Sequence, residues 1–219
     1  MVDEFVAIKT DTQGIDKYTK AAFDANPEKN RYKGLLAYDV ARKVSFDRDA
    51  VQPGGDHDRL GPGERQVPVD PGRGRGADVD ATRADHRRVE GHADCRAWCW
   101  NNWPDRGVPP NFLACLRLIN RVMDLTPIVV HCSAGIGSTG TIFGLEVIMA
   151  RLQKGENCTV DKAVRELRDA RHGGVQMDIQ YVYIAHVLIA LTENKKLATK
   201  DELRDWLAGY ETLCKARGC

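Results

Sequence analysis

Apolar positions in the C-terminal half of the chain recur at helical spacing. The spacing predicts helices over residues 112–123, 139–152, 160–171 and 178–193. The second and fourth of these segments are apolar on most of their surface, so we expect them to be buried. The third is amphipathic, and its Asp161 lies in the first turn, where a negative charge is stabilised by the helix dipole.

The two ends of the chain also carry helix signals. Residues 15–32 predict a helix followed by a turn at Asn26-Pro27. Near the C-terminus, Thr199 and Glu202 have the spacing of a capping box. An apolar stripe follows this box, so the sequence predicts an amphipathic helix within residues 196–219, with the stripe used for packing.

The stretch from Asp47 to Asp94 differs in character from its flanks. It is dominated by Asp, Arg, Gly and Pro, and it contains no Lys, Ile, Asn, Ser or aromatic residue. Because such a stretch cannot bury enough apolar surface to offset its ordering entropy, we expect residues 46–97 to be disordered. A second hypothesis is a wrong exon or reading frame. Sequencing the transcript across residues 45–98 tests it, and a clean in-frame read would end the idea.

Composition narrows the classes of protein to which the chain can belong. With 219 residues, 42% hydrophobic and 29% charged, it has the size and balance of one globular domain. The formal net charge of +1 argues against nucleic-acid binding. No apolar run of about 18 residues predicts a membrane span, and the N-terminus lacks the apolar region of a secretory signal. Seven scattered cysteines, an odd number, indicate a reducing, cytoplasmic compartment rather than a disulfide framework.

A predicted strand runs directly into a glycine-rich loop between Pro127 and Gly140. Residues 128–130 are β-branched and predict a short buried strand, and a helix follows the loop. In such a loop, successive backbone N–H groups can point at an anion, and the positive end of the next helix adds to the field. Cys132 at the start of the loop would have a lowered pKa and act as a nucleophile. A buried, inert cysteine at a strand end is the alternative.

The glycines of this loop also satisfy a second pattern. Gly135, Gly137 and Gly140 have the G-x-G-x-x-G spacing of a dinucleotide-binding turn. That fold needs a second strand ending in an acidic residue about twenty residues further on. The sequence that follows the helix is polar and then helical, so we set this interpretation aside.

The segment VVHCSAGIGSTG resembles the signature loop of the protein-tyrosine phosphatase family, His-Cys, five residues, then Arg and Ser/Thr. Three more segments resemble family motifs in the family's order: residues 29–32 the phosphotyrosine-recognition loop, 103–109 the mobile Trp-Pro-Asp loop and 175–181 the glutamine loop. The resemblance covers residues 22–44 and 98–195, and the stretch between shows none. It implies an α/β fold with a central twisted mixed sheet flanked by helices, truncated in the middle.

The resemblance and the composition together divide the chain. Residues 1–45 would hold the N-terminal helix and the recognition loop, and residues 46–97 the atypical segment. Residues 98–195 would form the phosphatase core, and residues 196–219 the C-terminal helix.

The resemblance also implies a catalytic role for individual residues. Cys132 would attack the phosphorus of a phosphotyrosine and form a cysteinyl-phosphate. Asp105 would protonate the leaving tyrosine oxygen as general acid, and the Thr139 hydroxyl would help the thiolate to leave in the second step. Gln176 would place the hydrolytic water, with Gln180 assisting.

Substrate binding and structural support are implied by the same resemblance. Tyr32, with Arg31, would bind the substrate and line a pocket for its ring. His131, Trp103 and Pro104 would be structural residues. The phosphate oxygens would be held by the backbone of the loop residues Ser133, Ala134, Gly135, Ile136, Gly137 and Ser138.

One departure from the family pattern bears on activity. Ser138 stands where the family has arginine, and the next arginine after Cys132 is Arg151, inside the predicted helix. The missing guanidinium is always charged and binds phosphate through two parallel hydrogen bonds. Since loss of one preorganised transition-state donor lowers the rate about 10²–10³-fold, we expect a defect of at least about 10³-fold.

Alternative functions stay open after this departure. One is a phosphotyrosine phosphatase with impaired or absent turnover. Another is a pseudophosphatase, a binding or scaffold module in signal transduction. A third is a decayed gene product without a stable fold. For the first two, the expected partners are phosphotyrosine-containing proteins, without nucleic acid, membrane insertion, metal or organic cofactor; the oligomeric state is left open.

Overall fold

The chain divides into two compact units. The computed structural model describes residues 1–14, 21–25, 27, 84–87, 95–98, 100, 103–122, 130 and 132–218. One unit combines Met1–Arg48 with Trp103–Cys219, and the other is Asp49–Asn102. The helices and the site considered below belong to the first unit.

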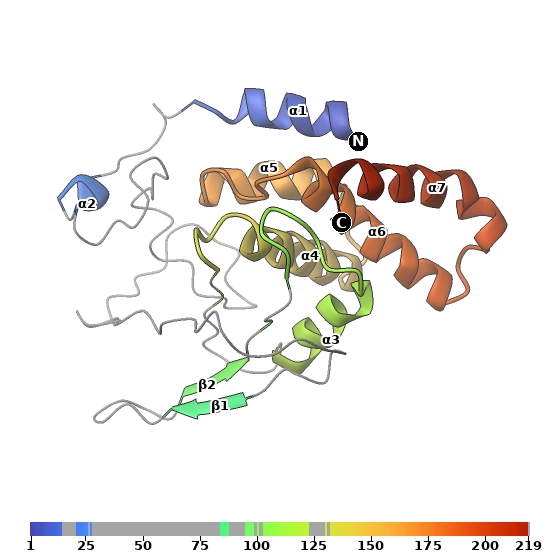
Figure 1. Cartoon of the computed structure of the whole chain (residues 1–219), viewed down its shortest axis with the longest axis horizontal. Helices are drawn as coiled ribbons and strands as arrows, with labels where there is room; N and C mark the ends of the chain where they lie inside the picture. The colour runs from blue at the N-terminus through green and yellow to red at the C-terminus, as the bar shows by residue number, and fades with distance from the viewer. Residues whose placement is uncertain are drawn as a thin grey trace. The chain divides into compact units, whose positions relative to one another are not determined.

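Helices dominate the first unit (Figure 1). In chain order they are α1 (Val2–Asp11), α2 (Ala21–Asp24), α3 (Phe112–Val122), α4 (Ser138–Gln153), α5 (Val160–Ala170), α6 (Asp178–Asn194) and α7 (Lys200–Arg217). The helices predicted over residues 112–123, 139–152, 160–171 and 178–193 are confirmed as α3 to α6, with ends within one residue of those expected, and the helix predicted within residues 196–219 is confirmed as α7. Of the helix predicted within residues 15–32, α2 is the described part.

Helix α6 is the centre of this unit. It packs against α1, α3, α4, α5 and α7. Its sequence is apolar around most of its circumference, and nine of its residues from Ile179 to Ala190 are buried. An all-round apolar helix is stable only when neighbours cover it on several sides, as these helices do.

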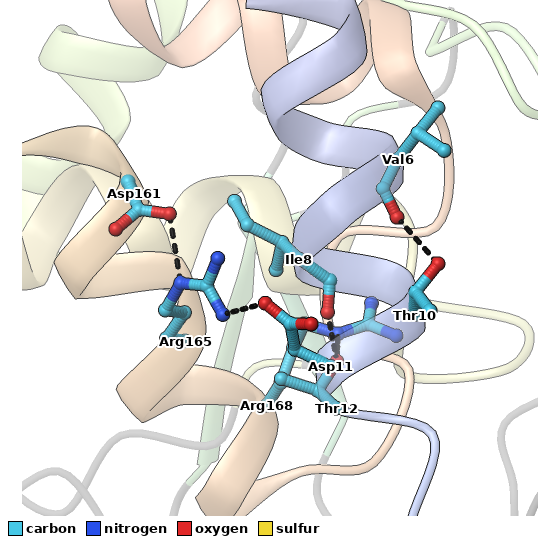
Figure 2. A network of polar contacts seen from close by, with 8 residues as sticks. All are labelled: Val6, Ile8, Thr10, Asp11, Thr12, Asp161, Arg165 and Arg168. Carbon is cyan, nitrogen blue, oxygen red and sulfur yellow. Dashed lines mark hydrogen bonds and ion pairs between the residues drawn. The ribbon is translucent and has the colours of Figure 1, made fainter.

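Helix α1 was not predicted from the sequence, because Phe5 and Ile8 are its only buried residues and form no extended stripe. Phe5 stacks on Tyr181 of α6 with ring centroids 5.2 Å apart. Polar contacts hold the other end of α1 to α5 (Figure 2), where Arg165 Nη1 forms an ion pair with Asp11 Oδ2 over 2.8 Å.

Helix α7 begins where the capping box of its sequence predicts. Thr199 N donates to Glu202 Oε2 over 2.8 Å and Glu202 N donates to Thr199 Oγ1 over 3.4 Å, which confirms the capping box. The apolar stripe packs on α6, where the ring of Tyr210 stacks on His186 with a centroid distance of 3.9 Å. The prediction that this stripe serves packing is therefore confirmed.

The second unit contains two short antiparallel strands, β1 (Ala84–Arg87) and β2 (Cys95–Trp98). The strand expected over residues 128–130 lies outside the described residues apart from Val130, so the central mixed sheet stays a prediction. The expected disorder likewise stays a prediction for the rest of residues 46–97. In the described part of the chain, no helix is both long enough and apolar enough to cross a membrane.

Candidate active site

Cys132 lies at the start of a loop of five bent residues that leads into α4. Gly135 adopts a φ of 69°, in the left-handed region that favours glycine, and this turns the chain back toward the cysteine. As a result, Gly135 N donates to Cys132 Sγ over 3.2 Å. The sulfur is half-buried, with one backbone amide of the loop aimed at it.

The surroundings of Cys132 favour its thiolate. Burial of the sulfur raises its pKa, but hydrogen bonds from the Thr139 side chain and backbone, the Ser138 side chain and the Gly135 backbone outweigh that effect. The resulting pKa is about 7, below the ordinary value of 9.0. The buried Thr139 Oγ1 has no other hydrogen-bond partner among the described residues, which leaves its proton available to the sulfur. Near neutral pH, a substantial fraction of the Cys132 side chains is therefore in the thiolate form, which is the nucleophile.

A glycine in α4 brings the glutamine loop against the signature loop. A Cβ atom at Gly140 would lie 2.4 Å from Val175 N, so only glycine permits this approach. Val175 has a φ of 59°, and its N–H donates to the carbonyl of Ile136 over 2.9 Å. The two loops are thus joined directly through their backbones.

Gln176 and Gln180 both lie beside Gly137 of the signature loop. A Cβ atom at Gly137 would lie 3.2 Å from Gln180 Nε2 and 3.3 Å from Gln176 Oε1. Gln180 is 1% exposed, and its Oε1 accepts from the N–H groups of Gln176 and Met177 over 3.1 and 3.2 Å. Its Nε2 donates to the carbonyl of Gly107 over 3.3 Å, so one side chain contacts three loops.

The Trp-Pro-Asp loop forms a compact turn. Gly107 N donates to the carbonyl of Pro104 over 3.2 Å, and Trp103 Nε1 donates to the carbonyl of Gly107 over 3.0 Å. The Trp103 ring meets Tyr183 of α6 edge-on at a centroid distance of 6.1 Å. Asp105 is exposed at the tip of this turn.

The described residues bring together most of the side chains that the resemblance singled out. The sulfur of Cys132 is stabilised by Ser138 and Thr139. Gln176 and Gln180 lie beside Gly137 of the same loop. The acid loop reaches them through Gly107. The predicted residues Arg31, Tyr32 and His131 lie outside the described residues, so their roles stay predictions.

Arg171 is a residue at this site that the sequence did not single out. Its Nη2 donates to the carbonyl of Ala134 over 3.1 Å and its Nε to that of Gly135 over 3.3 Å. The sequence offered no signal for it, because Arg165, Arg168 and Arg171 follow one another at a constant spacing of three residues. Within the described ranges, no group of three or more His, Cys, Asp or Glu side chains is placed to hold a metal ion.

Comparison with known proteins identifies the family. The sequence profile described as "Protein-tyrosine phosphatase" matches residues 78–190, just over half of the chain. The chain belongs to the protein-tyrosine phosphatase family. The match begins inside the atypical segment, so the expectation that this stretch shows no resemblance is wrong for residues 78–97. The sequence analysis relied on apolar periodicity, and the Asp, Arg, Gly and Pro residues of this segment leave little such periodicity.

Curated relatives of this phosphatase-family chain are much longer proteins. It is 33% identical over 116 residues to the phosphatidylinositol phosphatase PTPRQ of Rattus norvegicus, a match that covers 49% of this chain and 5% of that protein. It is 37% identical over 95 residues to the receptor-type tyrosine-protein phosphatase epsilon of Homo sapiens, covering 41% of this chain and 14% of the relative. The matched region is thus a small part of each relative's length.

Solved structures show the same fold over nearly the whole chain. The Trypanosoma cruzi protein tyrosine phosphatase TcPTP1 superposes with a TM-score of 0.63 at 20% identity, covering 94% of each chain. The Trypanosoma brucei phosphatase TbPTP1 gives 0.62 at 21% identity, covering 86% of this chain and 89% of that one. The resemblance to the family and a phosphatase-like fold are therefore confirmed, whereas the central mixed sheet stays a prediction.

Proposed function

We propose that this chain binds the phosphate of phosphotyrosine in the signature loop, and that its turnover through Cys132 is strongly impaired by Ser138. The observation that carries the proposal is the half-buried sulfur of Cys132, whose pKa is lowered to about 7 by donors of its own loop. An environment that stabilises one anion at this position also favours a phosphate beside it. The substrates would be phosphotyrosine-containing proteins, as the family membership supports. We propose the cytoplasm as their location.

The reaction would proceed in two displacements. In the first, the Cys132 sulfur forms a bond to phosphorus while the bond from phosphorus to the tyrosine oxygen breaks, and Asp105 gives its proton to that oxygen. In the second, a water beside Gln176 attacks the phosphorus, and the thiolate leaves with the Thr139 hydroxyl donating toward it. Asp105 takes the proton from that water, so the enzyme returns to its starting state.

Ser138 accounts for the expected impairment. Its hydroxyl donates toward the Cys132 sulfur and helps to lower the pKa of the thiol. A neutral hydroxyl carries no charge and a single proton, so it cannot replace a bidentate guanidinium on a phosphoryl group. Because two charge-assisted donors are missing at once, we expect a rate at least about 10³-fold below that of an arginine-bearing loop.

A phosphotyrosine-binding pseudophosphatase is the second candidate. The contacts between the three loops support it, because Gln180 still joins the signature, glutamine and acid loops although the cationic residue is absent. A signature loop held in this way would bind a phosphorylated side chain without hydrolysing it.

The deciding experiment measures phosphate release from a phosphotyrosine peptide, and binding of the same peptide by fluorescence anisotropy. The parent is compared with Ser138→Arg and Cys132→Ser, and Cys158→Ser serves as control because Cys158 is a half-buried cysteine outside the loop. We expect Ser138→Arg to release phosphate at least about 10³-fold faster than the parent. Cys132→Ser should release none, and Cys158→Ser should match the parent.

Other outcomes separate the two candidates. A parent rate close to that of Ser138→Arg would contradict the impairment. If Ser138→Arg releases no phosphate while the parent still binds the peptide, the chain is a binding module. If neither protein binds nor hydrolyses the peptide, the proposal fails.

A further inference from the structure

Arg171 contacts the signature loop from the end of α5. It follows the last residue of that helix, and its two hydrogen bonds reach the consecutive carbonyls of Ala134 and Gly135. The contact is close, because a Cβ atom at Gly135 would lie 3.1 Å from Arg171 Nη2.

One of these bonds determines the direction of an amide. The carbonyl of Ala134 and the N–H of Gly135 belong to the same planar, trans peptide unit, so they point in opposite directions. Arg171 holds the carbonyl over 3.1 Å, and the N–H at the other side of the plane donates to Cys132 Sγ over 3.2 Å. The guanidinium therefore fixes the orientation of a donor on the nucleophile without touching it.

Arg171 also brings a positive charge, and no acid among the residues that the structure describes neutralises it. In the described part of the chain, its hydrogen bonds go to the two carbonyls and it forms no ion pair with a carboxylate. Burial lowers its pKa, and the charge that counteracts this effect is the thiolate of Cys132. The charge of Arg171 thus interacts with the same sulfur that the Gly135 amide contacts.

We propose that Arg171 is a positioning residue that holds the Gly135 amide on Cys132 and supplies, from behind the loop, part of the positive potential missing at Ser138. The part of this inference that concerns phosphate binding rests on the proposed function. The geometry on the sulfur can be tested without any phosphate.

Arg168 provides a matched control. It lies three residues earlier on α5 and is 6% exposed. Its Nε donates to Thr12 Oγ1 over 2.6 Å, the contact drawn in Figure 2, and its Nη1 donates to the carbonyls of Gly174 and Val175 over 3.0 and 3.2 Å. Arg168 thus has the same charge and a similar number of backbone acceptors, but it holds α1 and the glutamine loop instead of the signature loop.

The test measures the pH profile of Cys132 alkylation by iodoacetamide in the full chain. Cleavage after Arg121 and Arg151 releases residues 122–151, in which Cys132 is the only cysteine, so mass spectrometry can follow this one thiol. The variants are Arg171→Met, Arg171→Lys, Arg168→Met and Arg168→Lys. Far-UV circular dichroism at the assay temperature confirms that each variant is folded.

We expect Arg171→Met to raise the midpoint of the profile by about one pH unit, because the variant lacks a positive charge that stabilises the thiolate. Arg171→Lys should restore most of that shift, because it keeps the charge. Protection of Cys132 by inorganic phosphate should weaken about threefold to tenfold in Arg171→Met, the effect of one screened charge near the anion. Both Arg168 variants should keep the parent midpoint.

The inference is overturned if Arg171→Met keeps the parent midpoint, or if Arg168→Met shifts it equally. If Arg171→Met does not fold, Arg171→Lys decides the question. A midpoint of Arg171→Lys close to that of the parent supports the charge argument. A midpoint raised to that of an ordinary thiol overturns it. Failure of the proposed function is distinct, because it appears as absent phosphate protection in the parent while the alkylation profiles still differ.

Discussion

The buried amide of Gln180 donates a hydrogen bond to the carbonyl of Gly107 over 3.3 Å, and this joins helix α6 to the turn that carries Asp105. The oxygen of the same amide accepts from the N–H groups of Gln176 and Met177. Both ends of the Gln180 amide are therefore used: its oxygen accepts hydrogen bonds and its nitrogen donates one. The position of the Trp-Pro-Asp loop depends on that donor.

Replacing Gln180 by glutamate tests this dependence. The variant keeps an acceptor for the two N–H groups but places an oxygen opposite the Gly107 carbonyl, so a buried hydrogen bond becomes a repulsion. We expect the free energy of unfolding to fall by about 1–3 kcal/mol, measured by urea denaturation at pH 7. Gln153→Glu, at the exposed end of α4, should change it by less than about 0.5 kcal/mol. Equal effects at the two positions would contradict the assigned role.

Gly140 allows the glutamine loop to approach α4, and its substitution should be far more harmful than that of another helical glycine. A Cβ atom at Gly140 would lie 2.4 Å from Val175 N, whereas at Gly209 of α7 nothing lies within 4 Å. We expect Gly140→Ala to lower the free energy of unfolding by about 1–3 kcal/mol through overpacking. Gly209→Ala should raise it by about 0.5–1 kcal/mol. Thermal denaturation of the two variants checks the opposite signs, and a neutral Gly140→Ala would refute the close approach.

Local signals explain which elements the sequence could predict. The capping box of Thr199 and Glu202 involves residues three apart, so α7 could be placed from the sequence alone. Helix α1 could not be predicted in this way. It has two buried residues, Phe5 and Ile8, and they are buried because the helix packs against other helices, including α6. Spacing predicts a helix when the apolar face is extended, and α1 lacks such a face.

The candidate site shows the same division between local and long-range information. Cys132 and the glycines of its loop could be identified because the whole motif is contiguous. The roles of Arg168 and Arg171 could not be told apart, since the two arginines lie three residues apart and differ only in which loop each side chain reaches. The positive φ of Val175 was also not predictable, because a β-branched residue rarely adopts it and the hydrogen bond to Ile136 compensates for it.

The Thr139 hydroxyl should control the ionisation of Cys132. Its hydrogen bond is the largest of the effects that lower the pKa of the thiol to about 7. We expect Thr139→Val to move the midpoint of Cys132 alkylation upward, toward the ordinary value of 9.0. Thr141→Val is the control, because Thr141 is equally buried but its hydroxyl donates to the carbonyl of Gly137 over 3.1 Å. The control should lose stability and keep its midpoint, and a Thr139→Val midpoint equal to the parent's would exclude the hydroxyl as a donor.

Acid should weaken the contact between the end of α7 and α6, because Arg217 of α7 holds Asp178 at the first turn of α6. Arg217 donates to both carboxylate oxygens, and this hydrogen bonding holds the pKa of Asp178 below its ordinary value. A carboxyl group whose pKa is lowered by folding stabilises the protein above its unfolded pKa of about 3.9, and the contribution is lost as the pH falls through the lower folded value.

Arg217→Met should therefore reduce the free energy of unfolding by about 0.5–1 kcal/mol at pH 7, a modest amount because the arginine is partly exposed. The difference from the parent should shrink as the pH is lowered from 5 to below the folded pKa of Asp178. Arg204→Met removes a fully solvated pair with Asp201, whose side chains are 69% and 84% exposed, and should have little effect at either pH. Urea denaturation of the three proteins across this pH range provides the measurement. A constant difference between Arg217→Met and the parent would show that the arginine acts by packing and not through the charge of Asp178.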